Sequence, residues 1–155
     1  MTRVLVLHAT RHGSTREVAQ AVAAAATAAG ADVRAAPAAS FRAPLAGFDR
    51  VVLGAPIYSG RWHRDAHRFL KRHRSELDSV PVAVFGLGPR RDAEEAWQSS
   101  RAQLDRALAR RPWLVPVAVA VFGGADPPGG KPGRRDLRDW AEIGDWARKV
   151  LASAA

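Results

Sequence analysis

The stretch LHATRHGSTR at residues 7–16 has the residue types and the spacing that point most directly to chemistry. Arg11, His12 and Gly13 after a strand are typical of enzymes in which a histidine attacks a phosphoryl group. The same stretch also forms a loop of small and hydroxylated residues that opens into a helix, and such loops hold a phosphate that does not react. These two chemistries need different partner residues elsewhere in the chain.

The rest of the sequence argues against a nucleophilic histidine. Such an enzyme needs a second histidine late in the chain, and no histidine follows His73. A dinucleotide-binding turn would need Gly-x-Gly-x-x-Gly, whereas the first turn has one glycine and GLGPRR at residues 86–91 lacks the third. The chain also has neither a Gly-Lys-Ser/Thr motif nor the aspartate that a receiver domain carries at the position of Gly54. Of the interpretations considered, a loop that binds a phosphate without reacting with it is the one that remains.

Thr10, Gly13, Ser14 and Thr15 have the properties of a phosphate-holding loop. Their hydroxyls can donate hydrogen bonds, the glycine allows close approach of the backbone, and the helix that begins there presents its positive end. An ordinary helix cap formed by Ser14 or Thr15 explains the same residues without a ligand. On the loop alone, both interpretations stay open.

Apolar runs and amphipathic stretches predict the elements that position this loop. Buried strands are expected at residues 4–8, 50–53, 80–89 and 114–124, with a shorter strand at residues 31–36. Helices are expected at residues 15–30, at 63–74 with Ala66, Phe69 and Leu70 inward, at 92–110 with Trp97, Leu104 and Leu108 inward, and at 137–152. The glycine- and proline-rich residues 123–135 are expected to form a flexible surface loop.

Five apolar strands that alternate with helices predict an α/β fold, a doubly wound five-stranded parallel sheet in a three-layer α/β/α sandwich. Without an internal repeat or a linker, residues 1–155 are expected to form a single domain. Open sheets of this kind bind ligands at the carboxyl ends of their strands. We therefore expect the glycine-bearing loops after the first, third and fourth strands to meet at one site.

Composition limits the other functions. The chain has no cysteine, which excludes disulfides, thiolate metal sites and cysteine nucleophiles, and we expect a cytoplasmic protein. No signal peptide or transmembrane segment is predicted. The formal net charge is +9, but no basic platform interleaved with aromatic residues is present, so nucleic acid is not expected as a partner. His63 and His67 have metal-ligand spacing without a third ligand, so no metal site is predicted.

The segment VLHATRHGSTREVAQAV at residues 6–22 resembles the flavodoxin signature. Thr10, Gly13, Thr15, Ala19 and Val22 fall in register with it, whereas His8 stands where an aromatic residue is usual. Residues 48–88 and RDWAEIGDWARKVLA at residues 138–152 are similar to the menaquinone-dependent protoporphyrinogen IX dehydrogenase group of flavodoxin-like proteins. Members of that group that work at membranes carry an extra apolar and basic segment after the last strand, where this chain has a polar loop, so peripheral membrane contact is not expected.

The resemblance implies a flavodoxin-like domain that binds FMN. It implies that the phosphate is held by Thr10, Arg11, His12, Gly13, Ser14 and Thr15; that the isoalloxazine ring lies along Ala55, Pro56, Ile57, Tyr58, Ser59 and Gly60; and that Gly86, Leu87 and Gly88 close its other side. A flat ring needs a stacking face, so we expect Tyr58 or Trp62 to stack on it, the alternative being that both pack beneath the loop.

The resemblance further implies an FMN-dependent oxidoreductase that oxidises a tetrapyrrole and passes the electrons to a quinone-type acceptor. The alternatives are a non-catalytic FMN electron carrier and a basic phosphate- or nucleic-acid-binding module without flavin. No catalytic acid or base is nominated, because the flavin carries the redox chemistry. The cations of the second predicted helix form either a solvated face or a docking surface for an acidic protein or for tetrapyrrole propionates; they are Arg61, Arg64, Arg68, Lys71, Arg72 and Arg74.

Overall fold

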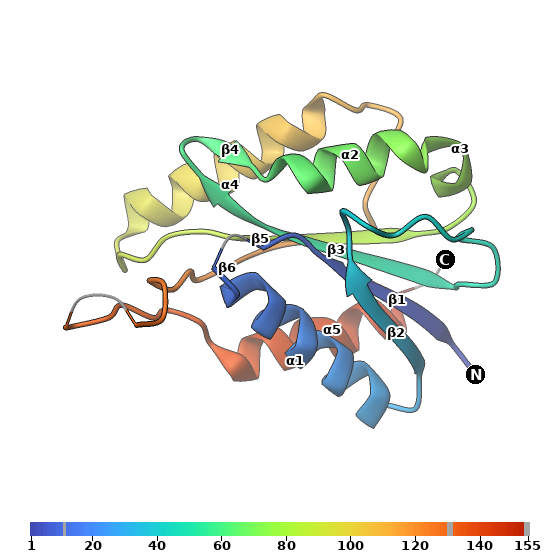
Figure 1. Cartoon of the computed structure of the whole chain (residues 1–155), viewed down its shortest axis with the longest axis horizontal. Helices are drawn as coiled ribbons and strands as arrows, with labels where there is room; N and C mark the ends of the chain where they lie inside the picture. The colour runs from blue at the N-terminus through green and yellow to red at the C-terminus, as the bar shows by residue number, and fades with distance from the viewer. Residues whose placement is uncertain (11, 130–131, 154–155) are drawn as a thin grey trace.

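A single twisted sheet lies between two layers of helices in the computed structural model, which describes residues 1–10, 12–129 and 132–153 (Figure 1). Five parallel strands follow the order β2-β1-β3-β5-β6. Their bounds are β1 Arg3–His8, β2 Asp32–Pro37, β3 Arg50–Tyr58, β5 Val82–Leu87 and β6 Ala118–Phe122, and the short β4, Arg61–Trp62, pairs antiparallel with the end of β3. The predicted five-stranded parallel sheet is confirmed.

The helices divide between the two faces of the sheet, as Figure 1 shows. Helices α1, Ser14–Ala28, and α5, Trp140–Ala152, cover one face. Helices α2, Arg64–Arg72, α3, Arg74–Leu77, and α4, Glu94–Ala109, cover the other. The predicted three-layer arrangement is therefore confirmed. None of the helices in the described residues is long and apolar enough to cross a membrane.

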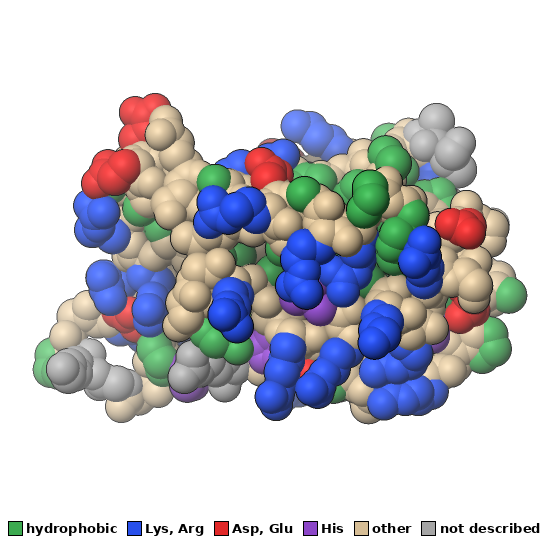
Figure 2. Space-filling view, turned by 90° about the horizontal axis from the view of Figure 1, so that it is seen from above, with side chains coloured by type: hydrophobic (Ala, Val, Ile, Leu, Met, Phe, Trp, Pro, Cys, Tyr) green, Lys and Arg blue, Asp and Glu red, His purple; other side chains and the backbone are tan. Residues whose placement is uncertain are grey.

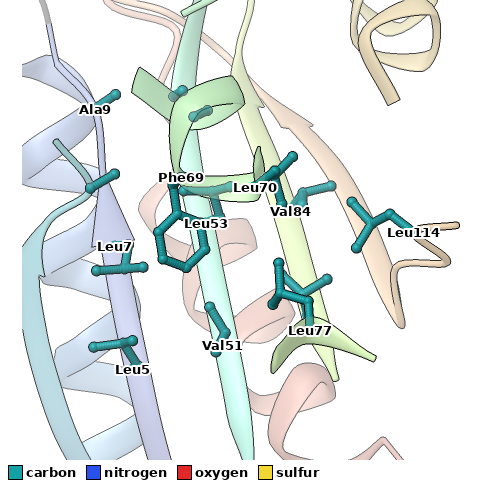
Figure 3. Close-up of a cluster of buried hydrophobic side chains, with 14 of the residues drawn as sticks. Leu5, Leu7, Ala9, Val51, Leu53, Phe69, Leu70, Leu77, Val84 and Leu114 are labelled. Atoms are coloured by element: carbon teal, nitrogen blue, oxygen red, sulfur yellow. The ribbon is translucent and has the colours of Figure 1, made fainter. Parts of the chain in front are cut away.

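Alternating side chains of the buried strands build two cores. Toward α2 and α4, Leu5, Leu7 and Leu53 belong to one cluster, and Figure 3 shows Phe69 and Leu70 of α2 lying over Leu53. Toward α1 and α5, the second cluster joins strand and helix residues; it comprises Val4, Val6, Val18, Ala19, Val22, Val52, Ala83, Phe85, Leu87, Phe122, Ile143, Ala147 and Val150. Each fully buried large aliphatic side chain contributes roughly 1.5 to 3 kcal/mol. Both faces of the sheet are therefore held by apolar packing.

The third strand is longer than its sequence predicts. It was expected to end at Leu53, but it continues through Gly54, Ala55 and Pro56 to Tyr58, paired with β5 as far as Leu87. Glycine does not end the strand because the ring of Phe85 fills the space above Gly54; a Cβ there would lie 1.9 Å from Phe85 Cζ. A turn at Ser59 and Gly60, both with positive φ, then returns the chain as β4.

The last strand and the last helix both begin later than predicted. Strand β6 starts at Ala118 rather than at Leu114, because Pro112 and Pro116 have no N–H to donate and Val115 is 81% exposed. Helix α5 starts at Trp140 rather than at Leu137, because the carboxylate of Asp139 caps it by accepting from the Glu142 N–H. The Leu137 N–H instead donates to the carbonyl of Gly124.

The loop expected to be flexible is cross-linked where it is described. Ala125 and Asp136 form an isolated antiparallel bridge. Asp126 accepts from the backbone and side chain of Arg135 and pairs with Arg90 at 3.3 Å. The loop after β6 is therefore tied both to itself and to the loop after β5.

Helix α4 turns a different face inward than predicted. Leu104 is buried as expected, together with Ser100 and Ala107. Trp97 does not enter the core; it is half-buried, and its indole N–H donates to Asp92 at 2.9 Å. Leu108 packs against the core from a partly buried position. The small Ser100 is needed on the inner face because it lies against Gly88.

The histidines of the basic helix are packed rather than solvated. His63 caps α2 by accepting from the Asp65 N–H through Nδ1, and only 9% of it is exposed. His67 lies half-buried edge-on to the Trp62 ring, with its Nδ1 2.7 Å from Arg111 Nη1.

Arg72, one of the cations of α2, donates to backbone carbonyls, including that of Phe41 at 3.2 Å. Among the described residues, no group of three or more His, Asp or Glu could hold a metal.

Gly54→Ala is expected to lower the free energy of unfolding by roughly 1 to 3 kcal/mol, because the added methyl group overlaps the Phe85 ring. Gly144→Ala in α5 is the matched control, since its Cβ would lie 3.5 Å from Arg148 Nη1 in ordinary contact. The control is expected to raise the free energy of unfolding by roughly 0.5 to 1 kcal/mol through helix propensity. Urea denaturation followed by circular dichroism measures both, and equal effects would contradict the packing argument.

The unfolding free energy is expected to fall between pH 6.5 and pH 4 because of His67. Burial and the charges of Arg111 and Arg110 lower the pKa of His67 from 6.5 to about 4, so in this window the unfolded chain binds a proton that the folded chain does not. The half-exposed ring limits the loss to on the order of 1 kcal/mol. Denaturation across this pH range should show a shallower fall in His67→Asn, which cannot take up that proton; an unchanged fall would contradict the assignment.

Candidate functional site

A cleft lies at the carboxyl ends of the strands, where the loops after β1, β3 and β5 meet. Its empty volume is about 580 Å³, counting space open to solvent. It is lined by Thr10, His12, Ser14, Thr15, Pro56, Ile57, Tyr58, Leu87, Gly88, Arg90, Gly124 and Ala125. The predicted convergence of the three loops is therefore present. Arg11, which was also predicted in the first loop, lies outside the described residues.

The first wall of the cleft is the start of α1. Gly13 is the N-cap with φ of 91°, a conformation that favours glycine, and its N–H donates to Thr10 Oγ1 at 2.8 Å. No side chain caps the helix, so the alternative interpretation of Ser14 or Thr15 as an ordinary helix cap does not hold. The first N–H groups of an α-helix have no acceptor within the helix, and Ser14 and Thr15 at this helix start line the cleft.

Ser14 adds an unpaired polar atom to this wall. Its Oγ is buried and has no hydrogen-bond partner within the described part of the chain. Thr15 beside it is 1% exposed. A buried hydroxyl without a partner costs about 1 to 3 kcal/mol, and it lines a cleft next to the positive end of a helix. This wall is therefore suited to an anion that accepts hydrogen bonds.

The second wall is the end of β3, with Pro56, Ile57 and Tyr58 on the cleft. The other residues predicted along this strand do not line the cleft. Ala55 is fully buried, and Ser59 and Gly60 line a neighbouring groove. Gly86, predicted on the opposite side, does not line the cleft but makes room for Ile57, whose Cδ1 would lie 2.6 Å from a Cβ at that position.

Trp62 is not available as a stacking residue. Its side chain is 2% exposed and belongs to the core cluster under α2. The indole N–H donates to the carbonyl of Ala55 at 3.2 Å, and the ring is edge-on to His67. Antiparallel pairing of β4 with β3 turns this side chain toward the core. Of the two predicted aromatic residues, Tyr58 is the one that lines the cleft.

The third wall comes from the loops after β5 and β6. Gly88 donates its N–H to the carbonyl of Phe122, and Gly124 donates to that of Pro89, both at 2.8 Å. Sequence reasoning missed Gly124 and Ala125 because the loop after β6 was expected to be flexible. The paired glycines at positions 123 and 124 directly after an apolar run were the signal that could have placed this loop at the site.

The described lining of the cleft carries positive charge. It contains the guanidinium group of Arg90 and no carboxylate. Asp126, behind Arg90, is held ionised because hydrogen bonds from Arg135 and the charges of Arg135 and Arg90 lower its pKa. Its charge is thus offset by two guanidinium groups. The electrostatic field in the cleft favours a negatively charged ligand.

A larger groove adjoins the cleft and shares Ile57, Tyr58, Gly88 and Arg90 with it. The groove runs between the β3–β4 hairpin and α4, with an empty volume of about 1270 Å³, counting space open to solvent. Its remaining lining residues are Ser59, Gly60, Pro89, Arg91, Glu95, Ala96, Ser99, Ser100, Gln103 and Arg135. A second molecule could therefore lie beside whatever fills the cleft.

Comparisons with known proteins identify the family. The model of the flavodoxin domain family matches residues 5–126. Protoporphyrinogen IX dehydrogenase [quinone] of Escherichia coli K12 is 30% identical over 125 residues, which are 79% of this chain and 68% of that protein. The protein of the same description from Leishmania major is 30% identical over 82 residues, 52% of this chain and 35% of its own.

Solved structures agree in fold. A short-chain flavodoxin associated with a non-canonical PDU bacterial microcompartment superposes with a TM-score of 0.69 at 21% identity, over 100% of both chains. Oxidised Flavodoxin 1 from Bacillus cereus superposes with a TM-score of 0.66 at 16% identity, over 99% of this chain and 100% of its own. With its parallel sheet, its cleft at the carboxyl ends of the strands and the match over residues 5–126, the chain belongs to the flavodoxin domain family.

Proposed function

We propose that this protein is an FMN-dependent oxidoreductase that oxidises a tetrapyrrole of the protoporphyrinogen type and passes the electrons to a quinone-type acceptor. The observation that carries this proposal is the groove of about 1270 Å³ beside the cofactor cleft, because an oxidoreductase needs room for a substrate next to the flavin. The relatives from Escherichia coli and Leishmania major, each 30% identical over the matched residues, are described as protoporphyrinogen IX dehydrogenase [quinone], which supports this proposal.

The start of α1 is proposed to hold the FMN phosphate. The buried Ser14 Oγ without a partner, the hydroxyls of Thr10 and Thr15, and the uncapped N–H groups of the helix together match the acceptor oxygens of a phosphate. His12 lines the same wall, and Arg11 is kept as part of the proposed loop. This donor set fits FMN, which ends in a single phosphate, better than a flavin with a second nucleotide.

The flavin ring is proposed to lie between the end of β3 and the loop after β5. Tyr58, Ile57 and Leu87 supply apolar contact there, and Gly88 allows close approach of the backbone. Bound FMN supplies the transfer of hydride and electrons, whereas the protein orients it and sets its surroundings. Ala55, Gly86 and Trp62 are proposed to support these walls from behind rather than to touch the ring.

The groove is proposed to receive an acidic, flat substrate. Arg90, Arg91 and Arg135 line it, and guanidinium groups pair with carboxylates in a bidentate manner. Arg91 is also paired with Glu95 at 2.9 Å on the surface, an exposed ion pair of little energy that a substrate carboxylate could replace. Propionate groups would thus be held at the rim while the tetrapyrrole faces the flavin.

A non-catalytic FMN electron carrier is the second candidate function. It is favoured by the structural neighbours, several of which are flavodoxins that match this chain over nearly its whole length. In that case the basic surface would serve an acidic redox protein. We keep the cytoplasm as the proposed location and expect no nucleic-acid partner.

Ser14→Ala is expected to weaken FMN binding about tenfold or more, because it removes a hydrogen bond to a charged group. The apo protein should keep or slightly gain stability, since the hydroxyl has no partner among the described residues. Titration of the apo protein with FMN, followed by flavin fluorescence, measures the affinity. Ser79→Ala on the far side of α3 is the control, and equal affinities of the two variants would remove Ser14 from the phosphate site.

The FMN-loaded protein is expected to oxidise protoporphyrinogen IX under anaerobic conditions with menadione as acceptor, which porphyrin fluorescence detects. Ser99→Trp should fill the groove and lower kcat/KM about tenfold or more without changing FMN affinity. Gln98→Trp is the matched control, because Gln98 neighbours Ser99 on α4 but does not line the groove. Turnover no faster than with free FMN would instead support the electron carrier.

A further inference from the structure

A second cleft, separate from the cofactor site, gathers four cations on the face covered by α2, α3 and α4. Lys71 of α2, Arg74 of α3, and Arg110 and Arg111 after α4 line it together with Trp113. Its empty volume is about 480 Å³, counting space open to solvent. Figure 2 shows this face, with Lys and Arg side chains gathered over it and few acidic ones among them.

This second cleft lies at the amino-terminal ends of the strands, whereas the proposed FMN site lies at their carboxyl ends. In this fold each helix begins near the carboxyl ends of the strands and runs back, so the last turns of α2 and α4 lie at the amino-terminal edge. None of its lining residues lines the cofactor cleft or the adjoining groove. A ligand here would not compete with FMN or with its substrate.

Two of the four cations are held in place. Arg111 approaches His67 twice, with Nη1 2.7 Å from the ring Nδ1 and Nη2 donating to the backbone carbonyl at 3.3 Å. Arg74 lies over the Trp113 ring, with its Cζ 5.1 Å from the centroid. The two guanidinium groups are thus fixed by a neutral imidazole and by an aromatic face, neither of which offsets their charge.

The four cations lack acidic partners. Within the described residues, none of them forms an ion pair with a carboxylate within 4.0 Å. Glu76, two residues after Arg74, is engaged by His73 and by the backbone N–H of Leu45. The carboxyl ends of α2 and α4 supply about half a negative charge each, far less than four full positive charges. The repulsion among these cations is therefore largely unrelieved within the protein.

We propose that this cleft binds a phosphate group, either of a soluble phosphate compound or of an anionic lipid. Arg74 presents a fixed guanidinium group, Arg111 keeps further N–H donors beyond the two that His67 engages, and Lys71 and Arg110 add exposed charges. A phosphate group offers more acceptor oxygens than a carboxylate, so it can accept hydrogen bonds from more of the four cations. Val115, two residues after Trp113 in the sequence, is 81% exposed, and we expect it to contact the lipid if the phosphate belongs to a lipid headgroup.

Isothermal titration with inorganic pyrophosphate tests the proposal. The protein is kept saturated with FMN so that the loop at α1 is occupied, in a chloride buffer free of phosphate and sulfate. Saturable binding is expected, and Arg110→Gln and Lys71→Gln should each weaken it about tenfold, the loss of one hydrogen bond to a charged group. Arg106→Gln on the same helix is the matched control, because it removes the same charge without lining the cleft.

Sedimentation with vesicles separates the two sources. Binding to phosphatidylglycerol vesicles but not to phosphatidylcholine vesicles, displaced by pyrophosphate and lost in Arg110→Gln, assigns the lipid headgroup. Pyrophosphate binding without vesicle binding assigns a soluble phosphate. Absence of both, or an equal loss in Arg106→Gln and Arg110→Gln, would overturn the proposal.

Unfolding without any added anion gives an independent measurement. Relief of repulsion should move the urea midpoint of Arg110→Gln upward relative to the parent protein. A downward shift would mean that Arg110 serves to stabilise the carboxyl end of α4, and it would contradict the proposal.

Discussion

The pairing of β3 with both of its neighbours is the constraint on which the site depends. His8, the last residue of β1, stands opposite Gly54, whereas Leu87, the last residue of β5, stands opposite Pro56. Strand β3 itself runs on to Tyr58. At about 3.3 Å per residue, the last four residues of β3 rise roughly 13 Å above the end of β1. This step gives the cleft a low wall at α1, where the phosphate is proposed to bind, and a high wall at Tyr58, where the flavin ring is proposed to lie.

A close contact between β3 and β5 accompanies that register. Phe85 lies over Gly54, and it also packs against Phe122 at 5.5 Å and Trp146 at 5.9 Å between ring centroids. One aromatic side chain of β5 therefore joins the central strand, the edge strand and α5. A side chain at position 54 would overlap the Phe85 ring and push β3 and β5 apart. The two walls of the cleft that these strands form, the end of β3 and the loop after β5, would move with them.

Ion pairs connect the remaining loop to the start of α1. Arg138, whose side chain is 4% exposed, pairs with Asp136 at 2.7 Å and with Glu17 at 3.2 Å, and it reaches the carbonyl of Ser14 at 3.4 Å. Asp136 in turn forms the bridge with Ala125, which lines the cleft. Arg90, Arg135 and Arg138 near the proposed cofactor site thus have acidic partners, unlike the lysine and three arginines around Trp113. At the carboxyl ends of the strands, arginines therefore form ion pairs that hold the loops together. At the amino-terminal ends, the cations around Trp113 have no such partners among the described residues.

The sequence was informative where one short-range pattern determines the outcome, and misleading where distant residues decide it. The apolar runs placed β1, β3 and β5, because a strand buried on both faces must be apolar throughout. The edge strand β2, DVRAAP, is mostly exposed, and its position was predicted from its place between a helix and a proline. Whether Trp62 faces the ligand or the core depends on a two-residue strand that pairs back onto β3. Likewise, Gly54 was predicted to follow the end of a strand but lies within one, and the aromatic ring of Phe85, thirty-one positions later, fills the space beside it. Tyr58 and Trp62 were equivalent as loop aromatics in the sequence; the hairpin between them is what leaves one at the cleft and puts the other in the core.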